Sequence, residues 1–428
     1  MHNLSETGPA EFRLVPAKYD PYALASATAL LAVVAAAFAY AVKPLPFSDW
    51  AYYWDAASGT ASYERGGVLL FVLRAIQSLE LDPYLAALAM NLPAAVVILV
   101  MTYVADGRRI GIATALVLAY LLAITPYFSV VQFDLSATAL LFAGFFLLVV
   151  WGSDNRRIGV TLLALVSVAL AVSSRPQFLL ILLFFGGTLA LCSLATKRSF
   201  RQHQQSTVVV AVVLVAAAML GFGIDSALRA HAGRAEAVRT NSAVTLYAGL
   251  LSSGVQRPSC GHWSATATRD ARADAETPLV QAISQRLEQH SFQHWVSVVK
   301  CKAPGILLPP PYALSWSLGA PNVTERVNSA EDAVQLDRRT TRAYRIEHWG
   351  YRGLLLLIYA YVIVVGLQRA RNGRWMAALI PLLWIASYWA VHSVFEIQAR
   401  YFLSLFLALP FLATSGVASI FDPRHGRP

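Results

Sequence analysis

Long runs of apolar residues, most of them close to twenty positions in length, alternate along the chain with short polar segments. A run of that length is enough for one helix to cross the hydrocarbon core of a bilayer. The pattern therefore predicts an all-α integral membrane protein with about ten transmembrane helices. The expected spans are residues 24–42, 84–105, 112–127, 135–151, 158–172, 177–194, 208–224, 353–367, 376–391 and 401–420.

The run at residues 66–79 is different because it is shorter and contains Arg74 and Gln77. It is too short for a comfortable span, and its polar residues would lie at membrane depth. We interpret it as an interfacial or re-entrant helix within a first outer loop at residues 43–83.

Basic residues in the short loops favour this topology, since Lys and Arg gather on the cytoplasmic side. With the N-terminus in the cytoplasm, each inner loop contains two or three of them: Arg108 and Arg109; Arg156 and Arg157; Lys197, Arg198 and Arg201; Arg369, Arg371 and Arg374. The outer turns near Asp134, Arg175 and Glu396 contain at most one each. A further span at residues 66–79 would move every later basic loop outside, so we expect ten spans.

The composition limits the function classes. The chain is 57% hydrophobic and 14% charged, and its net charge of +10 arises largely in these loops, so we expect no nucleic-acid partner. There is no Gly-rich phosphate loop, no His-Glu-x-x-His and no Gly-x-Ser-x-Gly, and four of the nine histidines, His262, His294, His348 and His392, are scattered. Nucleotide hydrolysis, zinc chemistry and serine hydrolysis therefore have no support. The first apolar run lacks a cleavage site for a signal peptide, so we expect it to stay as an anchor.

The predicted organisation has three parts: a transmembrane core with the first outer loop at residues 1–224, an outer subdomain at 225–349, and C-terminal transmembrane helices at 350–428. The middle segment is too long for a plain loop. Apolar residues at Leu279, Ile283 and Leu287 predict one amphipathic helix that continues towards Trp295. Cys260 and Cys301 lie in this segment, on the side where disulfides persist, and either form a bridge or remain two free thiols.

Charged residues that this topology places on the outer face are the candidates for chemistry. Asp49 and Asp55 lie among four aromatic residues at positions 48–57, and a spacing of six points them in different directions on a helix. We therefore expect one of the two to do chemistry, although an interfacial anchor rich in Trp and Tyr is the alternative. Arg175 and Arg400 lie close to membrane depth, where a charge marks function unless it snorkels to the interface.

Together these residues suit group transfer. Arginine binds phosphate with two parallel hydrogen bonds, and a carboxylate can deprotonate a hydroxyl nucleophile. They fit transfer from a phosphorylated lipid to a hydroxyl at the outer surface. We expect no cofactor; a divalent metal held by Asp49, Asp55 or Asp134 is the alternative.

Several short segments, in order and sidedness, resemble the type C glycosyltransferases, which transfer a sugar from a polyprenyl-phosphate carrier to an acceptor outside the cytoplasm. The similar segments are residues 48–57 after the first span, Asp82-Pro83-Tyr84, Thr125-Pro126-Tyr127 leading to Asp134, Ser174-Arg175-Pro176 and Gln398-Ala399-Arg400-Tyr401. The resemblance implies that Asp49 is the catalytic base and Asp134 a second acidic position of the site. It also implies a multi-pass protein of the bacterial inner membrane with its active site on the periplasmic face.

On this hypothesis the enzyme moves a sugar to a hydroxyl of a lipid or glycan acceptor and inverts the anomeric configuration. Asp55 or Asp134 orients a substrate, and acceptor recognition falls to residues 225–349. Arg400, Arg175, Arg65 and Lys302 are the candidates for the donor phosphate. Tyr53, His392, Glu396 and Tyr401 are expected to line the substrate site.

Two other functions remain open. A polysaccharide polymerase or ligase also works on lipid-linked sugars, but its donor carries a diphosphate. A lipid or solute transporter is the non-enzymatic alternative, and transporters often have broken helices at mid-membrane and internal pseudo-symmetry. The sequence has neither feature, which favours an enzyme.

Overall fold

The computed structural model describes residues 20–41, 49–61, 63, 65–106, 110–152, 158–195, 201–231, 235–251, 260–263, 265–311 and 330–421. Ser48 and most of the loop residues used for the topology argument lie outside these ranges: Arg108, Arg109, Arg156, Arg157, Lys197 and Arg198. The topology they favour therefore stays a prediction.

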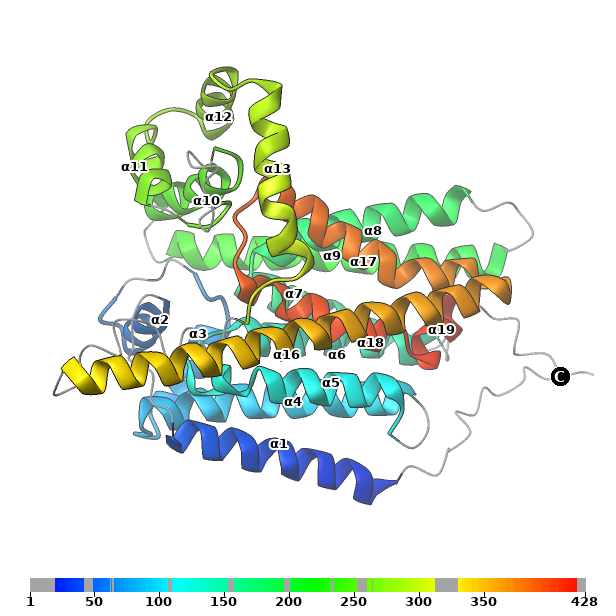
Figure 1. Cartoon of the computed structure of the whole chain (residues 1–428). Coiled ribbons are helices and arrows are strands. Elements are labelled where there is room, and N and C mark those ends of the chain that lie inside the picture. The colour runs from blue at the N-terminus through cyan, green and yellow to red at the C-terminus, as the bar shows by residue number, and fades with distance from the viewer. Residues whose placement is uncertain are drawn as a thin grey trace, which may run out of the picture.

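Helices are the secondary structure of the described residues, without any strand (Figure 1). In chain order they are α1 (Pro21–Ala41), α2 (Asp49–Ser58), α3 (Leu69–Gln77), α4 (Pro83–Asp106), α5 (Ile112–Ala123), η1 (Thr125–Ser129), α6 (Asp134–Gly152), α7 (Ile158–Ser174), α8 (Gln177–Ala195), α9 (Arg201–His231), α10 (Ala235–Leu250), α11 (Ala265–Ala273), α12 (Leu279–Glu288), α13 (Phe292–Leu307), α16 (Ala330–Arg371), α17 (Trp375–Val394), η3 (Ala399–Phe402), α18 (Leu403–Leu412) and α19 (Ser415–Phe421).

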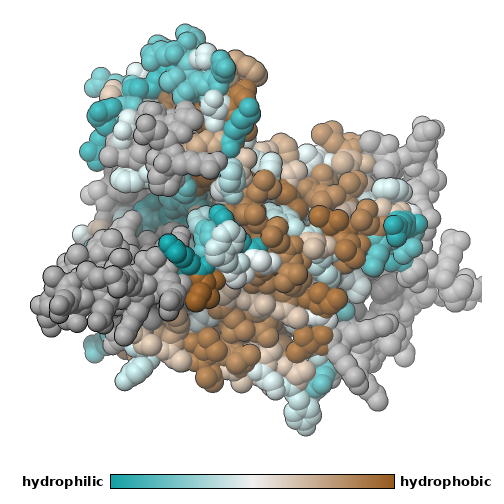
Figure 2. Space-filling view, viewed as in Figure 1, coloured by the Kyte–Doolittle hydropathy of each residue, from teal (hydrophilic) through white to brown (hydrophobic). Residues whose placement is uncertain are grey.

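Six described helices are long and apolar enough to cross a membrane, namely α1, α4, α8, α9, α16 and α17. Four shorter apolar helical segments lie in α5, α6, α7 and the η3–α18 region. The protein is therefore an all-α membrane protein, because a helix satisfies all its backbone hydrogen bonds internally within lipid. These ten helices coincide with the ten runs expected from the sequence; that all ten cross the bilayer stays a prediction. In Figure 2, apolar side chains gather over the bundle, whereas hydrophilic ones cover α11 and α12.

Helix α3 corresponds to the ambiguous run at residues 66–79. With nine residues it is about 14 Å long, roughly half the hydrocarbon thickness of a bilayer. Leu69, Leu70 and Leu73 are buried against the bundle, while Phe71 and Val72 are exposed. This two-faced helix is too short to span, and its interfacial position stays a prediction.

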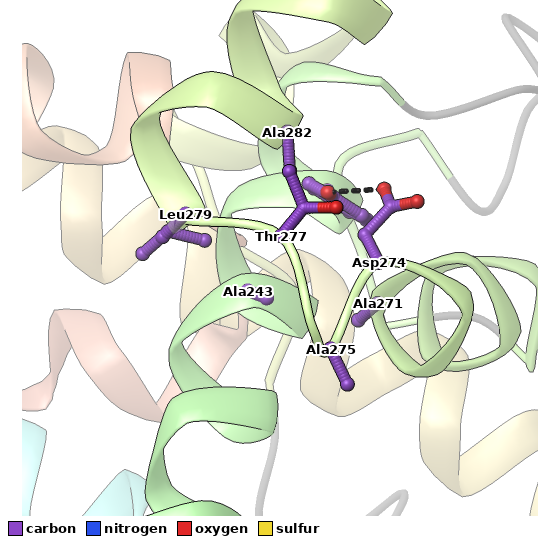
Figure 3. A pocket seen from close by; sticks show the side chains of 8 residues that line it. Ala243, Ala271, Asp274, Ala275, Thr277, Leu279 and Ala282 are labelled. Atoms are coloured by element: carbon purple, nitrogen blue, oxygen red, sulfur yellow. Dashed lines mark hydrogen bonds between the residues drawn. The ribbon is translucent and has the colours of Figure 1, made fainter.

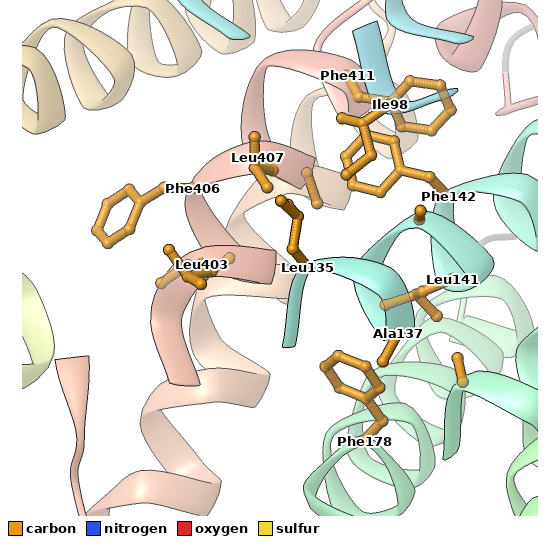
Figure 4. Packing of buried hydrophobic residues seen from close by; sticks show 14 of the residues in the cluster. Ile98, Leu135, Ala137, Leu141, Phe142, Phe178, Leu403, Phe406, Leu407 and Phe411 are labelled. Atoms are coloured by element: carbon orange, nitrogen blue, oxygen red, sulfur yellow. The ribbon is translucent and has the colours of Figure 1, made fainter. Parts of the chain in front are cut away.

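Close approach between helices holds the core of the bundle together. A Cβ on Gly144 of α6 would lie 2.3 Å from a methyl carbon of Val168 in α7, and one on Gly221 of α9 would lie 2.5 Å from the Ala169 carbonyl oxygen. Small residues allow helices in a bilayer to make such tight van der Waals contacts. Apolar residues of α6, α8 and α18 fill the interior, where the rings of Phe142 and Phe411 lie 5.0 Å apart (Figure 4).

Helices α10–α13 form a subdomain with a small apolar core of its own. We call it the outer subdomain after its predicted side of the membrane, which stays a prediction. The expected boundaries at 224/225 and 349/350 fall inside α9 and α16, and α16 alone is 42 residues long, or about 63 Å. The expectation of one helix through Leu287 and Trp295 was wrong. The chain breaks after Glu288, and the Ser291 side chain accepts a hydrogen bond from the His294 N–H to begin α13.

The outer subdomain is tightly joined to the end of α17. A disulfide links Cys260 and Cys301, whose Cα atoms lie 6.0 Å apart. The Glu396 N–H donates to the Thr245 carbonyl (2.9 Å) and the Ile397 N–H to the Gly261 carbonyl (2.7 Å). A cavity of about 10 Å³ between α10 and α12, partly lined by Asp274, has room for no more than one water (Figure 3). The subdomain therefore fixes residues 396 and 397 in place, and this cavity is too small for a larger ligand.

Candidate functional site

The ends of several helices meet beneath the outer subdomain and bring five charged side chains together. They are Asp49 at the start of α2, Arg65 between α2 and α3, Asp134 at the start of α6, Arg175 between α7 and α8, and Arg400 in η3. Four of the five are almost completely buried, and Arg65 is 36% exposed. We call these five residues the Arg/Asp cluster.

Asp49 is the centre of the cluster. Its Oδ1 pairs with Arg65 Nη2, and its Oδ2 lies 2.5 Å from Arg400 Nη2. Burial raises the pKa of Asp49, but the guanidinium groups of Arg400, Arg65 and Arg175 more than offset this and hold it well below its usual range. As the first residue of α2, Asp49 also meets the positive end of that helix dipole. The carboxylate is thus ionised at any physiological pH.

Asp134 forms the second half of the cluster. Its Oδ2 pairs with Arg175 Nη2 and accepts a 2.6 Å hydrogen bond from the Tyr127 hydroxyl. Arg175 also donates from Nη1 to the Tyr53 hydroxyl at 3.2 Å. These contacts hold the Arg175 guanidinium from two sides, so Asp134 orients Arg175.

Gln132, which our sequence predictions did not include, joins the two halves. Its Oε1 accepts from Arg175 Nη2 (3.1 Å) and Arg400 Nη1 (3.0 Å), and the side chain is fully buried. Because guanidinium groups only donate, these contacts fix which end of the amide is the oxygen. The Nε2 group then has no hydrogen-bond partner among the described residues. The sequence offers one signal: Gln132 is a polar residue in an apolar stretch two positions before Asp134.

Comparisons with protein-family models, curated proteins and solved structures gave no match. The chemistry of the site therefore rests on its own residues. Three positive groups face two carboxylates, which leaves one positive charge within the cluster. Together with the unpartnered Nε2 donor of Gln132, that charge favours an anionic ligand.

Aromatic rings cover the arginines. The Arg65 guanidinium lies 5.0 Å from the centre of the Tyr52 ring, and that of Arg400 lies 5.4 Å from the Tyr401 ring. Arg175 lies 5.8 Å from the Tyr53 ring. Such cation–π contacts strengthen when the site is desolvated, and they fix the guanidinium planes. Tyr53 and Tyr401 thus contact arginines of the cluster, and that they line a substrate site stays a prediction.

His392 and Glu396 lie behind these rings. The His392 ring stacks on Tyr401 at 5.6 Å, and its Nδ1 is 3.0 Å from the Glu396 carbonyl oxygen. The Glu396 carboxylate accepts a hydrogen bond from Gln398. Burial raises the pKa of Glu396, and Gln398 and Arg400 only partly oppose this. The pKa values of Glu396 and Asp49 are thus shifted in opposite directions.

Two residues expected in the site lie elsewhere. Asp55 is exposed on a different face of α2 from Asp49, as their spacing of six predicts. Lys302 is buried, and its Nζ donates to the carbonyl oxygens of Gly249 (3.0 Å), Ser393 (2.9 Å) and Phe395 (2.8 Å). These three bonds use every N–H of the ammonium group, so Lys302 ties α13 to α10 and α17 and has no donor left for a phosphate.

The cluster contains no set of metal ligands. Among the described residues, no group of three His, Cys, Asp or Glu side chains comes together. Both oxygens of Asp49 face arginines, and an arginine also holds Asp134 Oδ2. The three arginines of the cluster therefore favour an anion.

Proposed function

We propose that this protein is a membrane glycosyltransferase. It moves a sugar from a polyprenyl-phosphate carrier to a hydroxyl of a lipid or glycan acceptor, on the outer face of a bacterial cytoplasmic membrane. The observation that supports this most is the buried Arg/Asp cluster with its one uncompensated positive charge. The order of the sequence segments that resemble type C glycosyltransferases adds to it.

The charge of the cluster favours one class of donor. A polyprenyl-phosphate sugar is a phosphodiester with a single negative charge, which matches the single excess positive charge. A diphosphate-linked glycan brings one more negative charge than the cluster can neutralise. The cluster therefore supports a monophosphate donor over the diphosphate donor of a polysaccharide polymerase or ligase.

The reaction raises the charge on the phosphate. The acceptor oxygen attacks the anomeric carbon, the bond from that carbon to the phosphate oxygen breaks, and the electron pair stays on the phosphate. Arg65 and Arg400 then face a developing second negative charge, so they stabilise the transition state more than the bound donor. Direct displacement inverts the anomeric configuration.

The acceptor proton goes to Asp49. In the free protein, Asp49 is a weak base because the arginines hold its pKa low. A bound phosphate shares Arg65 and Arg400 with Asp49, which weakens their hold and raises the basicity of the carboxylate. Donor binding thus prepares the base, while Asp134 and Tyr53 keep Arg175 in position.

Replacing Asp49 with Asn tests this proposal, and Asp55→Asn is the matched control on the same helix. The purified proteins in nanodiscs are given a panel of polyprenyl-phosphate sugars and polyprenyl-diphosphate sugars with lipid acceptors extracted from bacterial membranes. We expect Asp49→Asn to reduce transfer by about 100-fold or more, as for loss of a general base, and Asp55→Asn to leave it nearly unchanged. Transfer near the wild-type rate by a folded Asp49→Asn protein contradicts the role of Asp49. If the protein uses only the diphosphate donors, the proposed monophosphate donor class is wrong.

A further inference from the structure

A second hollow lies apart from the Arg/Asp cluster, between α2, α3 and the end of α9. Its volume is about 160 Å³, and it is partly open to the outside. Residues of the α2–α3 region and of α9 line it, and none of them belongs to the cluster. A hydrogen bond from the Tyr63 hydroxyl to Asp225 of α9 (3.3 Å) holds its two sides together.

Its polar groups are cationic or neutral donors. Arg74 and His231 line the hollow, and no carboxylate is among the described residues that do. The Nε of Arg74 donates to the Ala57 carbonyl at the end of α2 (2.7 Å), which fixes the guanidinium beside Gly59. Nearby Arg229 is different, because its Nη2 pairs with Asp225 at 2.5 Å. Arg74 thus presents a positive charge without a carboxylate in the lining.

The surroundings of the hollow are apolar. Phe71, which lines it, is 48% exposed, and Leu228 comes from the apolar stretch Thr207–His231 of α9. His231 is the last residue of that helix, where a span would reach the membrane surface. An acyl chain can therefore run along α9 while a polar group enters the hollow.

The size of the hollow decides between ligands. The hollow has a volume of about 160 Å³. That volume suits a phosphate group, whereas pockets for whole drug-sized ligands are about 300 Å³ or larger. The ligand therefore inserts a head and leaves the rest of its body outside.

We propose that this hollow binds the phosphate headgroup of an anionic membrane lipid, through Arg74 and His231, with the acyl chains against Phe71 and α9. A guanidinium is well suited to the headgroup because it makes paired, charge-assisted hydrogen bonds to phosphate. The site is independent of the proposed glycosyltransferase activity, since it shares no residue with the Arg/Asp cluster.

Native mass spectrometry tests this on the full chain. The protein is reconstituted in nanodiscs of equal parts phosphatidylglycerol and phosphatidylcholine, then released into detergent, and the lipids that stay bound are counted. The Arg74→Gln/His231→Gln variant is compared with Arg269→Gln, which removes one charge from an exposed side chain of α11 (76% exposed). His231→Gln alone, at an exposed helix end, keeps the test valid if the double variant is unstable.

We expect wild type and Arg269→Gln to retain phosphatidylglycerol in preference to phosphatidylcholine. In the double variant, the ratio of retained phosphatidylglycerol to phosphatidylcholine should be roughly tenfold lower. His231→Gln alone should lose part of this preference. The proposal is wrong if the folded double variant retains as much phosphatidylglycerol as the wild type. If the double variant does not fold, the same result with His231→Gln overturns the proposal. So does competition by inorganic phosphate at the affinity of the lipid, which identifies a soluble anion as the ligand.

Discussion

The substitution Gln132→Glu changes the charge of the Arg/Asp cluster while leaving its shape almost unchanged. Glutamate has almost the same shape as glutamine, and its carboxylate can accept the same two hydrogen bonds from Arg175 (3.1 Å) and Arg400 (3.0 Å). The substitution also removes the Nε2 group, which has no partner among the described residues. We therefore expect the variant to fold and to have a melting temperature at or above that of wild type.

The expected effect on ligand binding is large. The new negative charge cancels the excess positive charge of the cluster. A phosphate bound to the other side of the same guanidinium would lie about 6 Å from the carboxylate introduced at position 132, and two like charges at that distance repel by about 3 kcal/mol at an effective dielectric constant of about 20. This corresponds to roughly 100-fold weaker binding of a singly charged phosphate.

Isothermal titration of a short-chain prenyl phosphate diester into the detergent-purified proteins measures this. Gln281→Glu is the matched control, because it adds the same charge at an exposed position of α12. We expect Gln281→Glu to bind like wild type and Gln132→Glu to bind roughly 100-fold more weakly. A folded Gln132→Glu protein with wild-type affinity refutes the assignment of the cluster as the phosphate site.

Three further predictions concern stability. Lys302→Met leaves three buried carbonyl groups without their donor and should lower the free energy of unfolding by about 3 kcal/mol or more, in chemical denaturation, without weakening prenyl-phosphate binding. The pKa of Asp49 is depressed in the folded protein, so its ion pairs stabilise the fold above about pH 4. This contribution is lost as the pH falls further. On acidification, the melting temperature should therefore fall less in Asp49→Asn than in Asp55→Asn. Replacing both Cys260 and Cys301 with Ser removes a disulfide that joins residues 41 positions apart, and should lower the free energy of unfolding by up to about 4 kcal/mol. A reductant should lower the melting temperature of the wild type but not of this variant.

The sequence could predict which charged residues share one face. Apolar run lengths set the helix ends, and Asp49, Asp134, Arg175 and Arg400 each lie at such an end. Alternation across the membrane then places these ends on one side. This reasoning is local to each run, so it required no knowledge of how the helices pack.

Contacts between distant segments could not be predicted in this way. Lys302 looked like a phosphate ligand because it is a cation on the outer side, but its three carbonyl partners come from residues 249, 393 and 395. The role of Gln132 depends on two arginines, one of them 268 positions away along the chain. Ser291 is of a residue type that often caps helices, but the apolar spacing that continued past it led to the wrong prediction of one helix.

The Arg/Asp cluster is difficult to explain as a device for stability. Removing a charge from water costs several kcal/mol, and a buried ion pair often returns no more than that, so apolar residues of equal volume would hold these helix ends together at least as well. On the proposed function, the four buried charges and Arg65 provide a site already arranged for an anion, in which the two carboxylates act as counter-ions until the anion binds. Arg65 is the most exposed member of the cluster, whereas Arg400, on the other oxygen of Asp49, is buried. On the proposed function, a donor phosphate competes with Asp49 for both arginines, and we therefore expect the carboxylate to become available to accept a proton only when the substrate is present.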